Sequence, residues 1–355
     1  GGVIIFLRRP RLRSNLVLMI TFTMLIVLAS YLLFTYLLSW LDMVPLLLAF
    51  IANISISTSY HWKQSREREK EIRGLFGHYV SKNVVDAILS ENIPVKLDGH
   101  RTQVTILFSD IRGFTSISES LSPSELGRLL NLYFDEMIAA VFQNNGTLDK
   151  LMGDAVMAFF GSPMEDIDHQ QQACQCASDM IDRLHALNSS GKLPKGIRLE
   201  IGIGLHTGDA IVGNLGSSDF ADYTVIGDSV NLASRLEGLN KQYATNIIIS
   251  ADTWKHVKNT YKCRELDIVK VKGKEEEKPI YEMIVNDTST AVIDHYQQAL
   301  AYYRQREWKA ALAITNKLIE QYADGPSRQL AEKCRQLVNN PPASGWKPVT
   351  RLDEK

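Results

Sequence analysis

Residues 103–115 have the sequence QVTILFSDIRGFT, an apolar run followed by an acidic, glycine-containing turn. The apolar part is rich in β-branched and aromatic residues, which favours a strand. Asp110 stands at the end of this run, and a glycine at position 113 lets the backbone come close to a ligand. The stretch therefore predicts a buried strand that ends in a carboxylate, followed by a turn of Gly113, Phe114 and Thr115 that suits a phosphate.

Helices and strands alternate after this run. Ser122-Pro123-Ser124-Glu125 combines an N-cap, a proline at the first helical position and a glutamate at the third, so a helix is expected from there to Asn145-Gly146. Residues 147–160, TLDKLMGDAVMAFF, have the pattern of two short strands hinged at Gly153-Asp154. The remaining elements are a helix at about 168–187 and a strand at about 197–206. This order predicts an α+β fold with a ferredoxin-like βαββαβ layer.

Two acidic residues occupy comparable places in this predicted layer. Asp110 ends the first strand and Asp154 sits at the hairpin hinge, on strands that this fold makes neighbours. Each alone is more often a turn or cap residue. Together, two hard oxygen ligands beside a glycine turn suit two Mg²⁺ or Mn²⁺ ions that hold the phosphates of a nucleotide.

A third stretch, residues 222–237 (DYTVIGDSVNLASRLE), has the pattern of a strand, a glycine turn and a helix. Asn231 and Arg235 are four residues apart and share one helical face. An amide and a guanidinium aimed together can stabilise the charge of a pentavalent phosphorus. The alternative is an exposed helical arginine beside a capping asparagine.

Three motifs in the same order characterise a known family: FSDIRGFT at 108–115, DKLMGDAVMAFFG at 149–161 and DYTVIGDSVNLASRLE at 222–237. The sequence resembles a class III adenylate cyclase over residues 95–286. The resemblance implies a homodimer with two composite sites, in which the ribose 3′ oxygen of ATP attacks the α-phosphorus to give cyclic AMP and pyrophosphate. No side chain stands out as a general base. Asp110 could accept the proton, but a metal-bound carboxylate is a poor base, so water or a substrate phosphate is an equal candidate.

The resemblance also implies a role for each motif residue. Two Mg²⁺ or Mn²⁺ ions would be held by Asp110, the Ile111 carbonyl and Asp154 of one subunit. The other subunit would supply the remaining groups, which are Lys150 and Thr224 for adenine, Asn231 and Arg235 for the transition state, and Lys272 for the triphosphate.

The base assignment agrees with hydrogen-bond chemistry. Adenine offers an acceptor at N1 and a donor at N6, while lysine only donates and a threonine hydroxyl can accept. Lys150 with Thr224 therefore suits adenine. Similar guanylate cyclases tend to have Glu and Cys at the positions of Lys150 and Thr224. Many members of the family have Asp where this chain has Thr224, so the strictness of base choice stays open, and a guanylate cyclase is an alternative. A catalytically silent nucleotide-binding or dimerisation module is a second alternative, although such modules usually lack one of these residues.

One departure from the family concerns the loop at 214–224, NLGSSDFADYT, which has no arginine or lysine. Similar proteins often have an arginine there, near the phosphates, about where this chain has Phe220. Triphosphate binding is then weaker, or another cation such as Arg112 compensates.

The N-terminal region differs sharply in composition. Residues 1–60 carry only five charged side chains, and the stretches 14–41 and 43–60 carry none. Since a bilayer span needs about 20 apolar residues, two transmembrane helices are expected at about 15–36 and 43–60, with residues 1–7 as the end of a third. A buried hairpin of soluble helices is the alternative.

The flanking charges predict the orientation of these spans. Arginines precede the first span and basic residues follow the second, so both ends are expected on the cytoplasmic side of the inner membrane. The expected protein is multi-pass, with the lipid bilayer as a partner. The arrangement resembles bacterial receptor cyclases with an extracellular CHASE2 sensor.

The remaining segments are predicted to connect or extend the catalytic region. Residues 61–94 are expected to form a helical signalling linker, either as a dimerising helix or as a solvated spacer. Residues 287–355 contain apolar positions at helical spacing, which suggests about one tetratricopeptide-type repeat packed on the cyclase or on a dimer mate, followed by an extended tail from Pro341. With 39 basic and 40 acidic residues, the chain has no overall basic field for nucleic acid. The cysteines are expected to be core thiols; they are Cys174, Cys176, Cys263 and Cys334.

Overall fold

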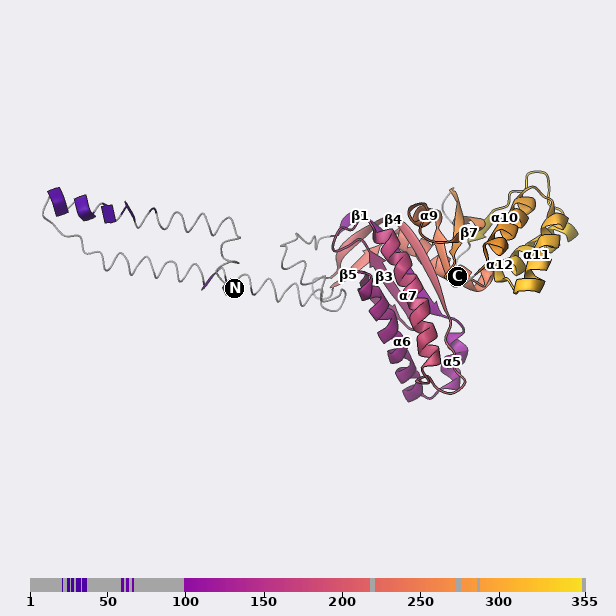
Figure 1. Ribbon diagram of the computed structural model, residues 1–355, viewed down its shortest axis with the longest axis horizontal. Helices are drawn as coiled ribbons and strands as arrows, with labels where there is room; N and C mark the ends of the chain where they lie inside the picture. Colours follow the sequence, from indigo (N-terminus) through magenta and orange to yellow (C-terminus); the bar gives the residue numbers. More distant parts are fainter. Residues whose placement is uncertain are drawn as a thin grey trace. The chain divides into compact units, whose positions relative to one another are not determined.

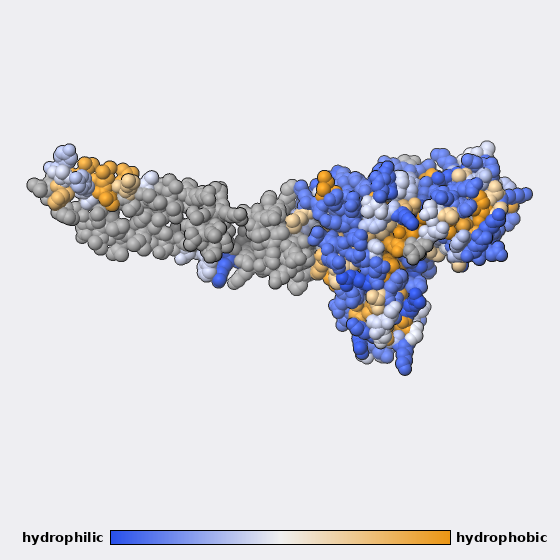
Figure 2. Space-filling model, viewed as in Figure 1, coloured by the Kyte–Doolittle hydropathy of each residue, from blue (hydrophilic) through white to orange (hydrophobic). Residues whose placement is uncertain are grey.

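The computed structural model describes residues 99–217, 221–271, 276–285 and 288–352, together with single residues between Thr21 and Arg66. The chain divides into two compact units, Gly1–Lys70 and Glu71–Lys355. In the first unit the described residues are helical, and apolar side chains such as Met24 and Leu25 are exposed (Figure 2).

None of the helices traced by the described residues is long and apolar enough to cross a membrane. The predicted spans at 15–36 and 43–60 and the linker at 61–94 fall largely outside these residues, and the segment 1–7 falls wholly outside them. These expectations therefore stay predictions.

The second unit is built on a nine-stranded sheet, in the spatial order β2-β3-β1-β4-β6-β8-β7-β9 with β5 paired to β4. The β4–β6 and β7–β9 pairs are parallel, and the other pairs are antiparallel. The strands are β1 (His100–Ile111), β2 (Thr147–Met152), β3 (Ala155–Phe160), β4 (Ile201–Gly216), β5 (Ala221–Ile226), β6 (Ile247–Ser250), β7 (Cys263–Val271), β8 (Glu277–Met283) and β9 (Thr350–Leu352). The order β2-β3-β1-β4 is that of the predicted ferredoxin-like layer.

Two long helices, α6 and α7, run side by side over one face of this layer (Figure 1). They enclose the largest apolar core, which includes Leu107 and Tyr133. The predicted capping box is present, because Ser122 and Glu125 bond each other's backbone amides. Among the described residues of this unit, the helices are α5 (Phe114–Ser120), α6 (Pro123–Gln143), α7 (His169–Ser189), α8 (Asp228–Tyr243), α9 (Ala251–Val257), α10 (Thr290–Arg304), α11 (Trp308–Tyr322) and α12 (Gly325–Asn339).

The fourth strand was predicted at 197–206 but β4 begins at Ile201 and runs on to Gly216. The late start has a local cause. The Asn188 side chain donates to the Leu199 carbonyl at 2.8 Å and accepts from the Leu199 amide at 2.8 Å, so these backbone groups do not join the ladder. The extension beyond His206 pairs with β5.

Residues of β5 pack against side chains of β1 and β3 in a second apolar cluster. Val104 and Phe159 lie in one apolar cluster with Tyr223 and Val225 of β5. The Tyr223 hydroxyl lies 2.8 Å from Ser162 Oγ, which ties β5 to the end of β3. This packing places Thr224 of β5 next to Lys150 of β2.

Helix α8 lies unusually close to β4, and Gly204 permits this approach. A Cβ at position 204 would lie 2.2 Å from the backbone nitrogen of Glu237 and 2.4 Å from the carbonyl oxygen of Ala233. Both neighbours are helix backbone, which cannot move as a flexible side chain can. The close approach of α8 to the sheet therefore requires a residue without a side chain at position 204.

We expect Gly204→Ala to destabilise the protein by about 1–3 kcal/mol, because α8 must shift to admit the methyl group. Urea unfolding followed by tryptophan fluorescence measures the loss. Gly127→Ala is the matched control, since it lies on α6 with nothing within 4 Å of its added Cβ and should be neutral or stabilising. Equal stability of the two variants would contradict this account of α8.

Of the three C-terminal helices, α10 packs on β7 and α12 packs on α8, while α11 packs on α10 and α12. Leu236 and Tyr243 of α8 share a core with Tyr296 and Leu300 of α10, together with Ile280 of β8. α12 begins at Gly325 and has Pro326 in its first turn. Among the cysteines, Cys174, Cys176 and Cys334 are buried and Cys263 is half-buried.

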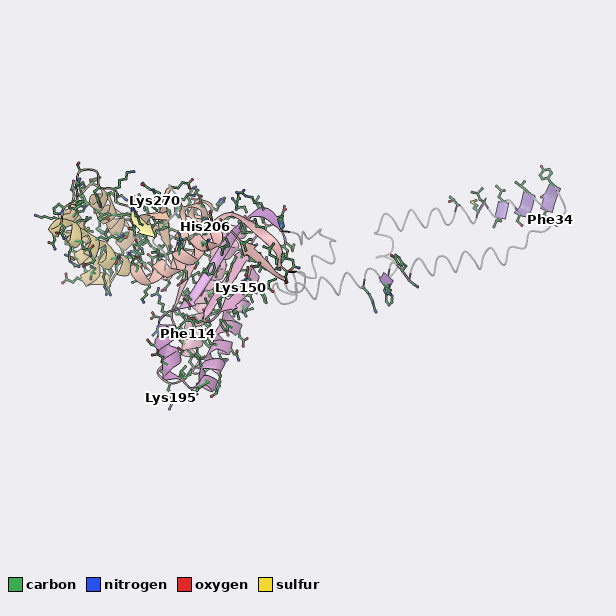
Figure 3. The ribbon with its side chains drawn as sticks, turned by 180° about the vertical axis from the view of Figure 1, so that it is seen from behind. Phe34, Phe114, Lys150, Lys195, His206 and Lys270 are labelled. Carbon is green, nitrogen blue, oxygen red and sulfur yellow. The ribbon has the colours of Figure 1, made fainter. Side chains whose placement is uncertain are left out.

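The segment after α12 is more firmly attached than the expected tail. The Trp346 ring meets the rings of Tyr303 and Trp308 edge-on, at centroid distances of 5.5 and 5.7 Å. β9 then pairs with the end of β7, where Lys270 lies opposite Arg351 (Figure 3). The attachment rests on long-range aromatic packing, which a short polar segment does not reveal in its own sequence.

Candidate active site

The carboxylates of Asp110 and Asp154 meet at one backbone amide. The Ile111 N–H donates to Asp110 Oδ1 at 3.1 Å and to Asp154 Oδ2 at 3.3 Å. Asp110 is the penultimate residue of β1, and Asp154 lies in the turn between β2 and β3. Since β1 pairs directly with β3, the fold brings the two acids together as predicted.

Burial and the neighbouring Asp110 carboxylate raise the pKa of Asp154 to about 7. Two close carboxylates cannot both be ionised cheaply without a positive charge between them. A divalent cation would supply that charge, and hard carboxylate oxygens are the donors that Mg²⁺ and Mn²⁺ prefer. The chemistry of this oxygen donor set thus fits the predicted metal site of Asp110, the Ile111 carbonyl and Asp154.

The turn after β1 has the geometry that its glycine predicts. Gly113 has φ 66°, and a Cβ there would meet nothing within 4 Å, so the backbone borders open space. Phe114 and Thr115 begin the short helix α5, which the sequence patterns did not predict. Phosphate binding by Gly113, Phe114 and Thr115 stays a prediction.

Lys150 and Thr224 come together from β2 and β5. Lys150 Nζ donates to Thr224 Oγ1 at 3.4 Å, and the Thr224 hydroxyl donates to Asp149 Oδ2 at 2.7 Å. The Asp149 side chain is fully buried, whereas 42% of the Lys150 side chain is exposed. In Figure 3, Lys150 lies on the side of the sheet away from the C-terminal helices.

Asn231 and Arg235 lie one turn apart on α8, as predicted. Asn231 is exposed and Arg235 half-buried. The apolar side of α8 faces elsewhere, because Ala233 and Leu236 are buried. The amide and the guanidinium are therefore presented on one side of the helix.

Within a single chain these three groups remain separate. No hydrogen bond or ion pair in the described part of the chain joins the acidic pair to Lys150, Thr224, Asn231 or Arg235. β3 stands between Lys150 on β2 and Asp110 on β1. A cavity of about 870 Å³ lies instead among β4, α8 and α9, and none of these residues lines it.

Two further expectations concern triphosphate binding. Lys272 and Phe220 lie outside the described residues. Arg112 is bonded within the fold, where its guanidinium donates to the Thr245 carbonyl. Burial lowers the pKa of Arg112, with opposing effects from Glu200 and Glu237. This engagement argues against Arg112 as the substitute cation.

Asp149 is a part of this site that the sequence patterns did not single out. Its place in an alternating strand, directly before Lys150, does not show which way the side chain points. A polar residue between Leu148 and Lys150 in a short strand was the only available signal. Its burial depends on an irregularity of the strand pairing.

These features agree with the comparisons with known proteins. Residues 98–284 match the family described as the "Adenylate and Guanylate cyclase catalytic domain". The match covers more than half of the chain, and the protein belongs to this family.

Among similar proteins, Adenylate cyclase 1 of Rhizobium meliloti (strain 1021) is 39% identical over 184 residues, covering 52% of this chain and 28% of that protein. The adenylate cyclase of Anabaena cylindrica is 42% identical over 199 residues, covering 54% of this chain and 39% of that protein. The chain thus spans about a third of the length of these relatives.

Solved structures of similar sequence include the adenylyl cyclase CyaB from P. aeruginosa, at 37% identity and a TM-score of 0.47, covering 54% of this chain and 98% of that chain. They also include the guanylyl cyclase Cya2, at 36% identity and a TM-score of 0.47, covering 52% and 93%.

Proposed function

We propose that this protein is an adenylate cyclase, which converts ATP to 3′,5′-cyclic AMP and pyrophosphate at composite sites of a homodimer. The ribose 3′ oxygen forms a bond to the α-phosphorus, the bond from that phosphorus to the bridging oxygen of the β-phosphate breaks, and pyrophosphate leaves. The 3′-hydroxyl proton passes to water or to a substrate phosphate oxygen.

The observation that supports adenine is the contact between Lys150 Nζ and Thr224 Oγ1, at 3.4 Å. A donor-only ammonium next to a hydroxyl that can accept matches N1 and N6 of adenine. Guanine has a donor at N1, which would oppose the donor-only ammonium of Lys150. The pair thus favours adenylate over guanylate cyclase within the family.

The acidic pair and α8 take complementary roles in this proposal. Asp110, the Ile111 carbonyl and Asp154 of one subunit hold two divalent cations, which when bound supply positive charge at the 3′ oxygen and at the phosphates. Asn231 and Arg235 of the other subunit donate to the oxygens of the α-phosphorus as charge builds up there. Lys272 contacts the triphosphate.

Most of the catalytic effect in this scheme is positioning and electrostatic stabilisation. Separation of the acidic pair from the Lys150–Thr224 pair within a chain supports sites shared between subunits. The uncharged stretches at 14–41 and 43–60 support attachment to the inner membrane, with the catalytic domain in the cytoplasm and regulation through the spans.

Turnover by the purified 355-residue chain tests the proposal. With Mg²⁺ or Mn²⁺, we expect cyclic AMP and pyrophosphate in equal amounts from ATP, much slower reaction of GTP, and no reaction with excess EDTA. Arg235→Ala is the matched inactive control, and we expect it to bind ATP while kcat falls about 100-fold.

Two results would contradict the assignment. Faster cyclisation of GTP than of ATP would indicate a guanylate cyclase. Nucleotide binding without a cyclic product from either base, in a dimer with both cations present, would indicate a silent module.

A further inference from the structure

Asp149 forms the buried base of the Lys150–Thr224 pair. Its Oδ2 accepts from the Thr224 hydroxyl at 2.7 Å and from the Val225 amide at 3.0 Å. Its Oδ1 lies 3.1 Å from Lys150 Nζ, in an ion pair without hydrogen-bond geometry. One carboxylate therefore contacts both side chains that the proposed function assigns to the base.

A β-bulge gives Asp149 this position. Leu148 pairs with Ala158 and Lys150 pairs with Met157, so Asp149 has no partner on β3. Neighbouring residues of a regular strand point to opposite faces, whereas a bulge redirects one of them. As a result, the consecutive side chains Asp149 and Lys150 both reach Thr224 Oγ1.

The carboxylate decides the direction of the Thr224 hydroxyl. An ionised carboxylate can only accept hydrogen bonds, so the Thr224 proton must point toward Asp149. The oxygen of Thr224 then has only lone pairs to offer a ligand. Lys150 offers only protons, and its loose contact with Asp149 leaves them free to turn toward a base.

We propose that Asp149 is a positioning residue that determines base specificity, because it holds Thr224 as an acceptor beside Lys150 as a donor. The matching ligand edge carries a donor next to an acceptor, as the N6 amino group and N1 of a 6-aminopurine do. A 6-oxopurine has the reverse polarity. The inference rests on the proposed function, which takes Lys150 and Thr224 as the groups that contact the base.

The test compares ATP with 6-methoxypurine riboside triphosphate. This analogue keeps the N1 acceptor that Lys150 needs, but it has an acceptor oxygen in place of the 6-amino donor. The ratio of kcat/KM for the two nucleotides, measured on the full chain, isolates the contact of Thr224 with the 6-position. Any steric effect of the methyl group is common to all variants and cancels when ratios are compared.

In Asp149→Ala the Thr224 hydroxyl is free to turn and donate to the methoxy oxygen. We expect the preference for ATP to fall about 10-fold or more, the size of one well-placed hydrogen bond. In Asp149→Asn the preference should stay within about 3-fold of wild type, because the Val225 amide holds the new amide oxygen toward Thr224. Asp149→Val replaces the alanine variant if the latter does not fold.

Two controls separate this role from general stability. Asp267→Ala removes another buried carboxylate, which accepts from Tyr243 and Thr350 far from the site, and should lower the melting temperature without changing the ratio. The double variant Asp149→Ala/Thr224→Val should have the ratio of Thr224→Val alone, since Asp149 acts through the hydroxyl.

An unchanged ratio in Asp149→Ala, an equal fall in Asp149→Asn or Asp267→Ala, or additive effects in the double variant would each overturn the inference. Dissociation constants of both nucleotides are measured in parallel and give the same ratio without turnover. Absence of ATP turnover in the wild type would contradict the proposed function, while the binding ratios would still decide the role of Asp149.

Discussion

Asp110→Ala protein is expected to retain less than about one-thousandth of wild-type cyclase activity, and to regain activity when mixed with an inactive Lys150→Ala protein. The first loss follows because Asp154 alone would face the phosphates with half of the ligand pair. The second variant loses the donor to adenine N1 and leaves the buried Asp149 without its cation.

Recovery depends on how the sites are shared. In a mixed dimer one site combines both defects, while the other takes Asp110 from the Lys150→Ala chain and Lys150 from the Asp110→Ala chain. Random reassociation makes half of the dimers mixed, and each then has one intact site of two. The expected activity is about one quarter of wild type.

The control is a mixture of Asp110→Ala with Asp154→Ala chains. Both substitutions then damage the same half of every site, so no mixed dimer has an intact one. Size-exclusion chromatography and differently tagged chains verify that mixed dimers form. Recovery in the control, or none in the Asp110/Lys150 mixture, would contradict composite sites.

Arg264→Met is expected to lower the free energy of unfolding by about 3–5 kcal/mol, the largest stability effect that we anticipate for one substitution. The Arg264 side chain is only 3% exposed and pairs with Glu282 and, at 2.9 Å, with Asp324. Burial alone would lower its pKa, but these two carboxylates raise the pKa above its ordinary value.

Methionine retains the approximate length of the side chain but leaves two buried acids without a cation. Asp324 also caps α12, where its Oδ2 accepts from the Ser327 amide at 3.0 Å. The substitution should therefore loosen the C-terminal helices from the sheet as well. Urea unfolding with an unchanged m-value gives the stability difference.

Arg335→Met is the matched control, because Arg335 forms an exposed ion pair with Glu332 on the same helix α12. Exposed pairs contribute about 0–1 kcal/mol, so this variant should unfold near the wild-type midpoint. A second substitution, Glu282→Gln, should recover part of the stability lost in Arg264→Met. Arg264→Met protein as stable as the control would refute the assignment.

The sequence predicted those parts of the fold that depend on local patterns. The capping box at Ser122 begins α6, and the hairpin hinge at Gly153-Asp154 separates β2 from β3 as expected. Convergence of Asp110 and Asp154 followed from the strand order, since Asp110 lies at the end of β1 and Asp154 directly precedes its antiparallel neighbour β3. For these elements the local sequence pattern and the observed strand order lead to the same arrangement.

The features that were missed depend on tertiary contacts. The burial of Asp149 needs the bulge in β2 and the approach of β5, neither of which leaves a local mark. The late start of β4 depends on Asn188, eleven residues before Leu199. β9 is three residues long and is placed by Trp346, so no strand pattern could develop there.

The strand β9 has a further consequence for the solubility of the protein. Without it, the outer side of β7 would present unpaired backbone amides and carbonyls, which are a template for pairing with a foreign chain. The three residues of β9 pair with this edge of β7, and β9 is too short to pair stably with a further strand. β9 is thus expected to protect this edge of the sheet against edge-to-edge aggregation.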